Sequence, residues 1–304
     1  MKILITGSEG QLGRELIKSC PKTINNQLIK LLPLNKKKFN LLNHQQLERE
    51  LKLFKPNWII NCAAYTNVEK SEDDKETSLQ INGFAPKIMA NTISEYGGKM
   101  LQISTDFVFD GKKNTPYLPN DLKKPLCVYG IGKALGEDAI ETILIPDKRG
   151  YIIRTSWLIG CYEDNFAQKI IKLSKTKNKL KVISDQIACT TSTRNLAKAC
   201  WQIITKDTFK THLPSITHFS DAGVASWFDV AVTVLEISNR LKISKSGCNI
   251  IPIKTKDFQT KATRPVFSLL DTDETYKVLD LNPEYWKYAL EKVILENATR
   301  KKLI

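Results

Sequence analysis

Apolar residues in the first half of the chain occur in two alternating patterns. Continuous apolar runs, each the length of a buried strand, occupy 2–7, 28–34, 56–64, 99–105 and 150–160. Apolar residues at helical spacing predict helices over 11–20, 44–54, 78–97 and 128–144. Strands that alternate with helices form parallel β-α-β units with right-handed crossovers. The pattern therefore predicts an α/β fold built on a doubly wound parallel sheet.

The pattern becomes less regular beyond about residue 160. It predicts helices over 165–175, 193–205, 226–241 and 282–297, the last with Pro283 near its first turn. Strands are predicted within 179–189, 216–221 and 249–255. We expect these segments to form a smaller C-terminal subdomain, with some of them returning to the main sheet.

A glycine-rich turn follows the first strand and opens the first helix. The segment TGSEGQLG contains Gly7, Gly10 and Gly13. Glycines at this spacing allow a tight turn, a close approach of a pyrophosphate, and close packing of helix on strand. The helix N-terminus then offers free N–H groups to the phosphates. The sequence thus predicts a Rossmann-type NAD(P)-binding domain over 1–160 and a mainly substrate-binding subdomain over 161–304.

The end of the second strand bears on the choice of cofactor. Enzymes that prefer NAD place an acidic residue here, where it binds the ribose 2′-hydroxyl. This chain instead reads PLNKKKF, with Asn35 followed by Lys36, Lys37 and Lys38. The run could be a solvated loop, but it also suits the 2′-phosphate of NADP. We expect NADPH to be the favoured cofactor and NADH to be a weaker alternative.

A hydroxyl, a phenol and an ammonium group lie at the end of the predicted strand over 99–105 and after it. Thr105 ends a strand, and Tyr129 and Lys133 are four residues apart on the next predicted helix, so their side chains share one face. Ligands of doubly wound sheets bind beyond the carboxyl ends of the strands. A Tyr-x-x-x-Lys pair alone can be a chance surface pair, whereas this combination predicts a proton donor with an electrostatic partner.

Composition restricts the remaining classes of function. The net charge of +14 comes from lysines spread along the chain, without a nucleic-acid-binding motif, so no nucleic-acid partner is expected. Seven scattered cysteines and three histidines favour reduced thiols over a zinc site or a histidine triad. No apolar run is long enough to span a bilayer, and the start lacks a signal-peptide pattern. We therefore expect a cytoplasmic protein without a membrane partner.

Several longer segments resemble the dTDP-4-dehydrorhamnose reductase family of extended short-chain dehydrogenases/reductases. The resemblance covers essentially the whole chain and is carried by NCAAYTNVEKSEDD (61–74), INGFAP (81–86), STDFVFDG (104–111), PLCVYGIGKALGE (125–137), RTSWLIG (154–160) and FSLLDT (267–272). It implies hydride transfer from a nicotinamide to the C4 ketone of dTDP-4-dehydro-β-L-rhamnose. The product would be dTDP-L-rhamnose, a precursor of surface polysaccharides.

The resemblance also implies a role for individual residues. Tyr129 would protonate the developing alkoxide, Lys133 would lower the pKa of the phenol and bind the nicotinamide ribose, and Thr105 would hydrogen-bond the carbonyl oxygen. Asp106 and Trp157 would contact the sugar, although core packing is an alternative for the tryptophan. The implied cofactor contacts are Gly7, Gly10, Gln11, Leu12, Gly13, Asn35, Lys36, Asn40, Leu41, Ala63, Ala64, Tyr65, Tyr129 and Lys133.

The chain departs from the family pattern at several positions. Asn35 and Asn40 stand where many members carry aspartate, and Thr190 and Thr191 stand where many read Pro-Thr. Some members bind magnesium between subunits through acidic side chains. This chain keeps Glu15 but has Arg194 in place of a second acid, so we expect no metal and either a monomer or a homodimer.

Three other functions remain open from the sequence. A reductase or epimerase of a different nucleotide-linked 4-keto sugar would share the same fold, because fold does not determine the substrate. A non-catalytic regulatory subunit of this fold would not need Thr105, Tyr129 and Lys133, whose presence argues against it. Nucleic-acid binding through the positive charge would show as a steep salt dependence.

Overall fold

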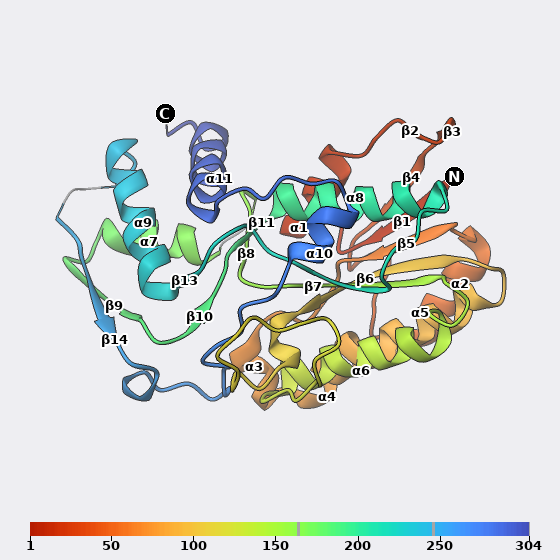
Figure 1. Ribbon diagram of the computed structural model, residues 1–304, viewed down its shortest axis with the longest axis horizontal. Coiled ribbons are helices and arrows are strands. Elements are labelled where there is room, and N and C mark those ends of the chain that lie inside the picture. The colour runs from red at the N-terminus through yellow and green to blue at the C-terminus, as the bar shows by residue number, and fades with distance from the viewer. Residues whose placement is uncertain (163–164, 245–246, 304) are drawn as a thin grey trace.

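A six-stranded parallel sheet forms the centre of the computed structural model, which describes residues 1–162, 165–244 and 247–303 (Figure 1). The strand order is β12-β7-β6-β5-β1-β4. The strands are β1 (Lys2–Thr6), β4 (Lys30–Leu34), β5 (Trp58–Asn61), β6 (Lys99–Thr105), β7 (Gly150–Thr155) and β12 (Ile216–Phe219). All neighbouring pairs run parallel, which confirms the predicted doubly wound sheet.

The chain reverses its direction of travel across the sheet at β1. It moves from β1 to β4 on one side and then crosses to β5 on the other side. Such a switch point opens a crevice at the carboxyl ends of the two central strands, where ligands of this fold class bind. The glycine turn lies directly after β1, so the sequence places it in this crevice.

Helices cover both faces of the sheet, as Figure 1 shows. On one face lie α1 (Gln11–Lys18) and α8 (Thr193–Thr208). On the other lie α2 (His44–Phe54), α5 (Ala85–Ser94) and α6 (Val128–Ile143). Ile3 and Ile5 pack in the first core and Leu4 in the second, because side chains of a strand alternate between faces. Burial on both faces explains why these strands read as continuous apolar runs.

A second lobe is built from the later segments around its own apolar core. Its helices are α7 (Phe166–Ser174), α9 (Trp227–Arg240) and α11 (Trp286–Arg300). Its parallel strand pair is β9 (Lys179–Ile183) with β14 (Asn249–Ile253). Two short pairs join the lobe to the sheet edge: β8 (Leu158–Ile159) with β11 (Thr191–Ser192), and β10 (Ile187–Ala188) with β13 (Ala225–Ser226).

Four features differ from the pattern-based prediction. The helix predicted over 78–97 is divided into α4 (Lys75–Leu79), a π-helical turn η1 (Gln80–Phe84) and α5. The strand predicted over 150–160 ends at Thr155. The last helix begins at Trp286, which leaves Pro283 outside it. Several short elements were not predicted: β2 (Thr23–Ile24), β3 (Gln27–Leu28), α3 (Val68–Asp73), η2 (Asp106–Val108), η3 (Thr255–Asp257), α10 (Asp273–Val278), and β11 and β13 named above.

The π-helical turn carries a side chain that bonds to the loop after β5. Asn82, within it, accepts a hydrogen bond from the Tyr65 backbone N–H (2.9 Å) and donates to the Tyr65 carbonyl oxygen (3.1 Å). The wider turn thus directs an amide side chain at the loop after β5, in keeping with the frequent occurrence of π turns near functional sites.

All seven cysteines are free. Within the described part of the chain, no helix is both long and apolar enough to cross a membrane.

Candidate active site

A cavity of about 670 Å³ opens at the carboxyl ends of β1, β5, β6 and β7. Apart from Asn35, every site residue predicted from the sequence lines it: Gly7, Gly10, Gln11, Leu12, Gly13, Lys36, Asn40, Leu41, Ala63, Ala64, Tyr65, Thr105, Asp106, Tyr129, Lys133 and Trp157. Segments that are far apart in the sequence therefore meet at the switch point of the sheet.

The glycine turn brings backbone into contact with backbone. Gly7 has φ +61°, a left-handed conformation that favours glycine. A Cβ atom on Gly13 would lie 2.2 Å from the Gly7 carbonyl oxygen, so only glycine allows α1 to begin here. Among the residues that the structure describes, no side chain caps the N-terminus of α1 at Gly10. Its first N–H groups therefore remain available to an anionic group in the cavity.

The loop after β4 contributes less positive charge than its sequence suggests. Lys36 lines the cavity, whereas neither Lys37 nor Lys38 does. Asn35 lies outside the cavity lining and donates from Nδ2 to Oε1 of Glu9 at 2.8 Å. Glu9 belongs to the glycine turn, and its carboxylate beside the loop was missed when only the residues after the strand were considered.

Thr105, Tyr129 and Lys133 line the same cavity. Lys133 is 4% exposed, and its Nζ donates to the Ile103 carbonyl oxygen of β6 at 2.5 Å. Burial lowers the pKa of Lys133 to about 8, and the nearby Glu137 carboxylate acts in the opposite direction.

The pKa of the Tyr129 phenol shifts in the opposite direction to that of Lys133. Burial raises its pKa above the ordinary value, and hydrogen bonding by the Thr105 hydroxyl lowers it in part. This direction is contrary to the lowering expected from Lys133. Desolvation is the largest cause of the shift in the Tyr129 pKa, and the Lys133 ammonium is bonded to the Ile103 carbonyl oxygen. A phenol with a raised pKa keeps its proton at neutral pH, as a general acid must.

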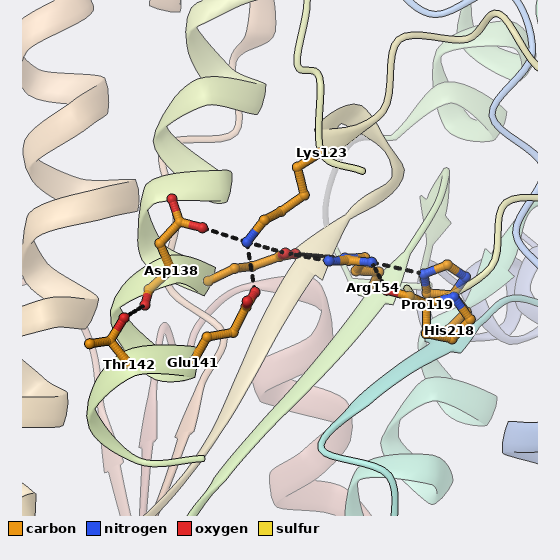
Figure 2. A network of polar contacts seen from close by, with 8 residues as sticks. Pro119, Lys123, Asp138, Glu141, Thr142, Arg154 and His218 are labelled. Carbon is orange, nitrogen blue, oxygen red and sulfur yellow. Dashed lines mark hydrogen bonds and ion pairs between the residues drawn. The ribbon is translucent and has the colours of Figure 1, made fainter. Parts of the chain in front are cut away.

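A buried ion pair fixes α6, and with it Tyr129 and Lys133, against the sheet (Figure 2). Arg154 of β7 donates from Nη2 to Oε2 of Glu137 on α6 at 2.7 Å and from Nε to Oε1 at 3.0 Å. The same guanidinium donates to the Pro119 carbonyl oxygen at 2.8 Å and lies 3.3 Å from Nε2 of His218. Lys123 closes the network by contacting Asp138 (2.5 Å) and Glu141 (2.6 Å).

Aromatic side chains form another wall of the cavity. Trp157 has φ +44°, a strained conformation for a bulky residue, and this bend ends the strand that was predicted to continue. Its ring stacks on Trp227 with centroids 3.7 Å apart, and Phe166 contacts Trp227 at 4.5 Å. Trp227 and Phe166 were missed by sequence reasoning. The available signal for Trp227 was its place at the start of α9, directly after the Ser226 cap.

Two carboxylates and a thiol gather beside α1. Ligand atoms of Glu15, Cys161 and Glu296 lie within 4.8 Å of one another. Lys18 Nζ is 2.5 Å from the Glu296 carboxylate, and Arg194 Nη2 is 3.3 Å from it. Because these two cations already neutralise the carboxylate, the cluster does not fit a divalent cation.

Comparison with known proteins agrees with this geometry. The family model described as "RmlD substrate binding domain" matches residues 1–299. The spore coat polysaccharide biosynthesis protein SpsK of Bacillus subtilis is 32% identical over 98% of each chain. The dTDP-4-dehydrorhamnose reductase of Aggregatibacter actinomycetemcomitans is 33% identical, over 96% of this chain and 98% of that protein.

Solved structures show the same relationship. A dTDP-4-dehydrorhamnose reductase from Clostridium acetobutylicum superimposes with a TM-score of 0.86 at 32% identity, covering 97% of this chain and 98% of that one. The Bacillus anthracis enzyme, solved in complex with NADP, gives 0.84 at 29% identity, covering 97% and 99%. The sequence match and the shared fold agree with the convergence of Thr105, Tyr129 and Lys133 in one cavity. This chain therefore belongs to the dTDP-4-dehydrorhamnose reductase family.

Proposed function

We propose that this protein uses NADPH to reduce the C4 ketone of dTDP-4-dehydro-β-L-rhamnose to dTDP-L-rhamnose. The observation that carries the proposal is the cavity itself, where an uncapped helix N-terminus and a glycine turn meet Thr105, Tyr129 and Lys133. A regulatory subunit would need the nucleotide-binding half of this arrangement, but not a buried phenol beside a strand-end hydroxyl.

The residues present fit a dinucleotide cofactor, which supplies the hydride when bound. The N–H groups at the start of α1 suit its pyrophosphate, and the absence of a Cβ atom at Gly10 allows the backbone to approach. Lys133 is positioned to bind a ribose hydroxyl as well as to act on Tyr129. Ala63, Ala64 and Tyr65 would line the cofactor from the loop after β5.

Proton transfer falls to Tyr129. As hydride reaches C4, negative charge develops on the ketone oxygen, and the phenol donates its proton to that oxygen. The Lys133 ammonium stabilises the resulting phenolate, which would otherwise be costly in a buried position. Thr105 adds a hydroxyl beside the same oxygen, where a hydrogen bond gains strength as the charge grows.

Cofactor preference follows from the loop after β4. Lys36 lines the cavity and is the lysine of the run that can reach a 2′-phosphate there. Glu9, bonded to Asn35, adds negative charge close by and reduces the advantage of NADPH without removing it. NADPH is therefore preferred and NADH is used less efficiently.

The second lobe supplies the remaining contacts with the nucleotide-sugar. We infer that residues 1–160 bind the cofactor and that 161–304 mainly bind substrate, with β12 and α8 belonging to the sheet. Trp157, Trp227 and Phe166 give this side of the cavity apolar faces that suit a sugar or a nucleobase. The enzyme would act in the cytoplasm as a monomer or homodimer, without a nucleic-acid or membrane partner.

A coupled assay tests the proposal directly. Purified protein is mixed with NADPH and the 4-keto sugar that the preceding 3,5-epimerase makes. Oxidation of NADPH is followed by absorbance, and the sugar formed is identified by NMR. We expect stoichiometric formation of dTDP-L-rhamnose. Turnover confined to another 4-keto sugar in a matched panel would favour a different reductase. A lack of turnover with every sugar, despite cofactor binding, would favour a regulatory subunit.

A further inference from the structure

A segment of the C-terminal region reaches the active site from the second lobe. Phe267 pairs with Ile187, and Leu270 pairs with Tyr117, and between these bridges Ser268 contacts Asp106. Ser268 lies between these contacts and is 2% exposed, with its backbone N–H bonded to the Ile187 carbonyl oxygen at 2.8 Å. Its hydroxyl donates to Oδ2 of Asp106 at 2.6 Å. The second lobe thus contacts the residue next to Thr105.

Hydroxyl donors hold both oxygens of the Asp106 carboxylate. Oδ2 accepts from the Ser268 hydroxyl at 2.6 Å, and Oδ1 accepts from the Thr105 hydroxyl at 3.0 Å. Asp106 is 2% exposed and lines the cavity next to Thr105. These contacts couple the ionisation of Asp106 to the Thr105 hydroxyl.

The neighbour in question is the Thr105 hydroxyl, which has only one proton to donate. Oγ1 of Thr105 accepts from the Phe107 backbone N–H at 3.2 Å and lies 3.0 Å from Oδ1 of Asp106. When Asp106 is ionised, the Thr105 proton is directed at the carboxylate. When Asp106 carries a proton, the carboxyl group donates to Thr105. The Thr105 proton is then free for the groups on the cavity side, which are the Tyr129 phenol in the free protein and the substrate oxygen in the complex.

We propose that Ser268 and Asp106 are positioning residues of the reduction, which together decide whether the Thr105 hydroxyl donates its proton to the substrate oxygen. This inference rests on the proposed function, because it concerns the oxygen that becomes an alkoxide in that reaction. A neutral Asp106 serves the reaction in a second way, since an anion beside the developing alkoxide would oppose its formation.

The pH dependence expected from this arrangement has a definite sign. Burial raises the pKa of Asp106 to about 6, and the Ser268 hydroxyl acts against burial by stabilising the carboxylate. The ionisable groups that line this part of the cavity with it are Cys62 after β5 and Tyr129 and Lys133 of α6. The kcat should fall as pH rises through the Asp106 step and fall again near pH 8, where Lys133 loses its proton.

The decisive measurement is the pH profile of kcat for Ser268→Ala beside wild type. Loss of the donor raises the pKa of Asp106, so the lower step should move by about one pH unit toward alkaline values. The upper step should not move, and NADPH affinity should be unchanged. Ser268→Thr, which retains a hydroxyl, should restore the wild-type profile. Ser238→Ala, which removes a buried hydroxyl in α9 outside the cavity, is the matched control.

A second variant and a direct titration of Asp106 keep the proposal testable if Ser268→Ala does not fold. Asp106→Asn cannot titrate, so the lower step should vanish while the upper one remains. Carbon-detected NMR of the Asp106 carboxyl group in the free protein should show its pKa rising by about one unit in Ser268→Ala. A lower step that persists in Asp106→Asn would overturn the role of Asp106.

The outcomes separate this inference from the proposed function. Wild-type turnover together with an unshifted profile and an unshifted carboxyl titration in Ser268→Ala would overturn the positioning role alone. Failure of wild type to reduce any 4-keto sugar would overturn the proposed function and, with it, the role of Ser268 in the reaction. A shifted lower step that Ser268→Thr reverses would establish both residues as positioning groups.

Discussion

Protonation of His218 should weaken the network that holds α6 in place. Nδ1 of this buried ring lies 3.0 Å from the Tyr117 carbonyl oxygen, which can only accept, so Nδ1 carries the proton. Nε2 then presents its lone pair to the Arg154 guanidinium at 3.3 Å (Figure 2). A second ring proton would face this guanidinium. Burial and the Arg154 charge accordingly lower the pKa of His218 from 6.5 to about 3.

The size of the effect follows from proton linkage. A folded-state pKa below the unfolded value means that the unfolded chain binds more protons, so stability is present at neutral pH and is lost on acidification. One pKa unit corresponds to about 1.4 kcal/mol. From the ordinary value of 6.5, His218 should therefore remove about 2 kcal/mol of stability by pH 5 and about 4 to 5 kcal/mol by pH 3.

Urea unfolding of wild type and His218→Asn at pH 7.5 and pH 5 measures this contribution. Asparagine can still donate to the Tyr117 carbonyl group but takes no charge. The stability advantage of wild type over the variant should shrink by about 2 kcal/mol between the two pH values. His212→Asn, at an exposed position, should show no such change. A difference between wild type and His218→Asn that does not vary with pH would refute the reasoning.

The remaining predictions concern the reaction. Tyr129→Phe should lower kcat about a hundredfold or more with little change in cofactor affinity, as measured by steady-state kinetics and fluorescence titration, and near-normal turnover would contradict it. Lys133→Ala should weaken NADPH binding and abolish the decline in kcat near pH 8, and an unchanged profile and affinity would leave Lys133 without a role. The kcat/KM for NADPH should exceed that for NADH by about tenfold, and added salt should narrow the gap. Lys36→Gln should reduce that ratio and Glu9→Gln should increase it, whereas equal ratios in all three proteins would place both charges outside the 2′-phosphate site.

Local patterns were sufficient to predict the framework of the site. The spacing of Gly7, Gly10 and Gly13 indicates a close approach of backbone to backbone, and the structure has this approach at the switch point of the sheet. Tyr129 and Lys133 share a helix face because of their spacing alone. Their meeting with Thr105 follows from the rule that ligands bind beyond the carboxyl ends of parallel strands.

Contacts between distant segments were beyond the reach of these patterns. The bond from Ser268 to Asp106 joins residues 162 positions apart, and neither residue type signals a partner. Glu9 lies beside Asn35 only because β1 and β4 are neighbours, which brings the glycine turn next to the following loop. Trp227 reaches the cavity through the placement of α9, and a tryptophan at a helix start is otherwise read as core.

The buried ionisable groups around α6 lower the free energy of unfolding and strengthen electrostatic interactions within the site. The native state holds Lys133 with its pKa lowered from 10.5 to about 8, a cost of about 3 kcal/mol at neutral pH relative to an exposed lysine. Arg154 and Glu137 are buried as a pair, which offsets desolvation only while both are present. The same low dielectric strengthens the action of Lys133 and Thr105 on a developing alkoxide. The stability lost by burying these groups around α6 therefore accompanies a preorganised proton-transfer site.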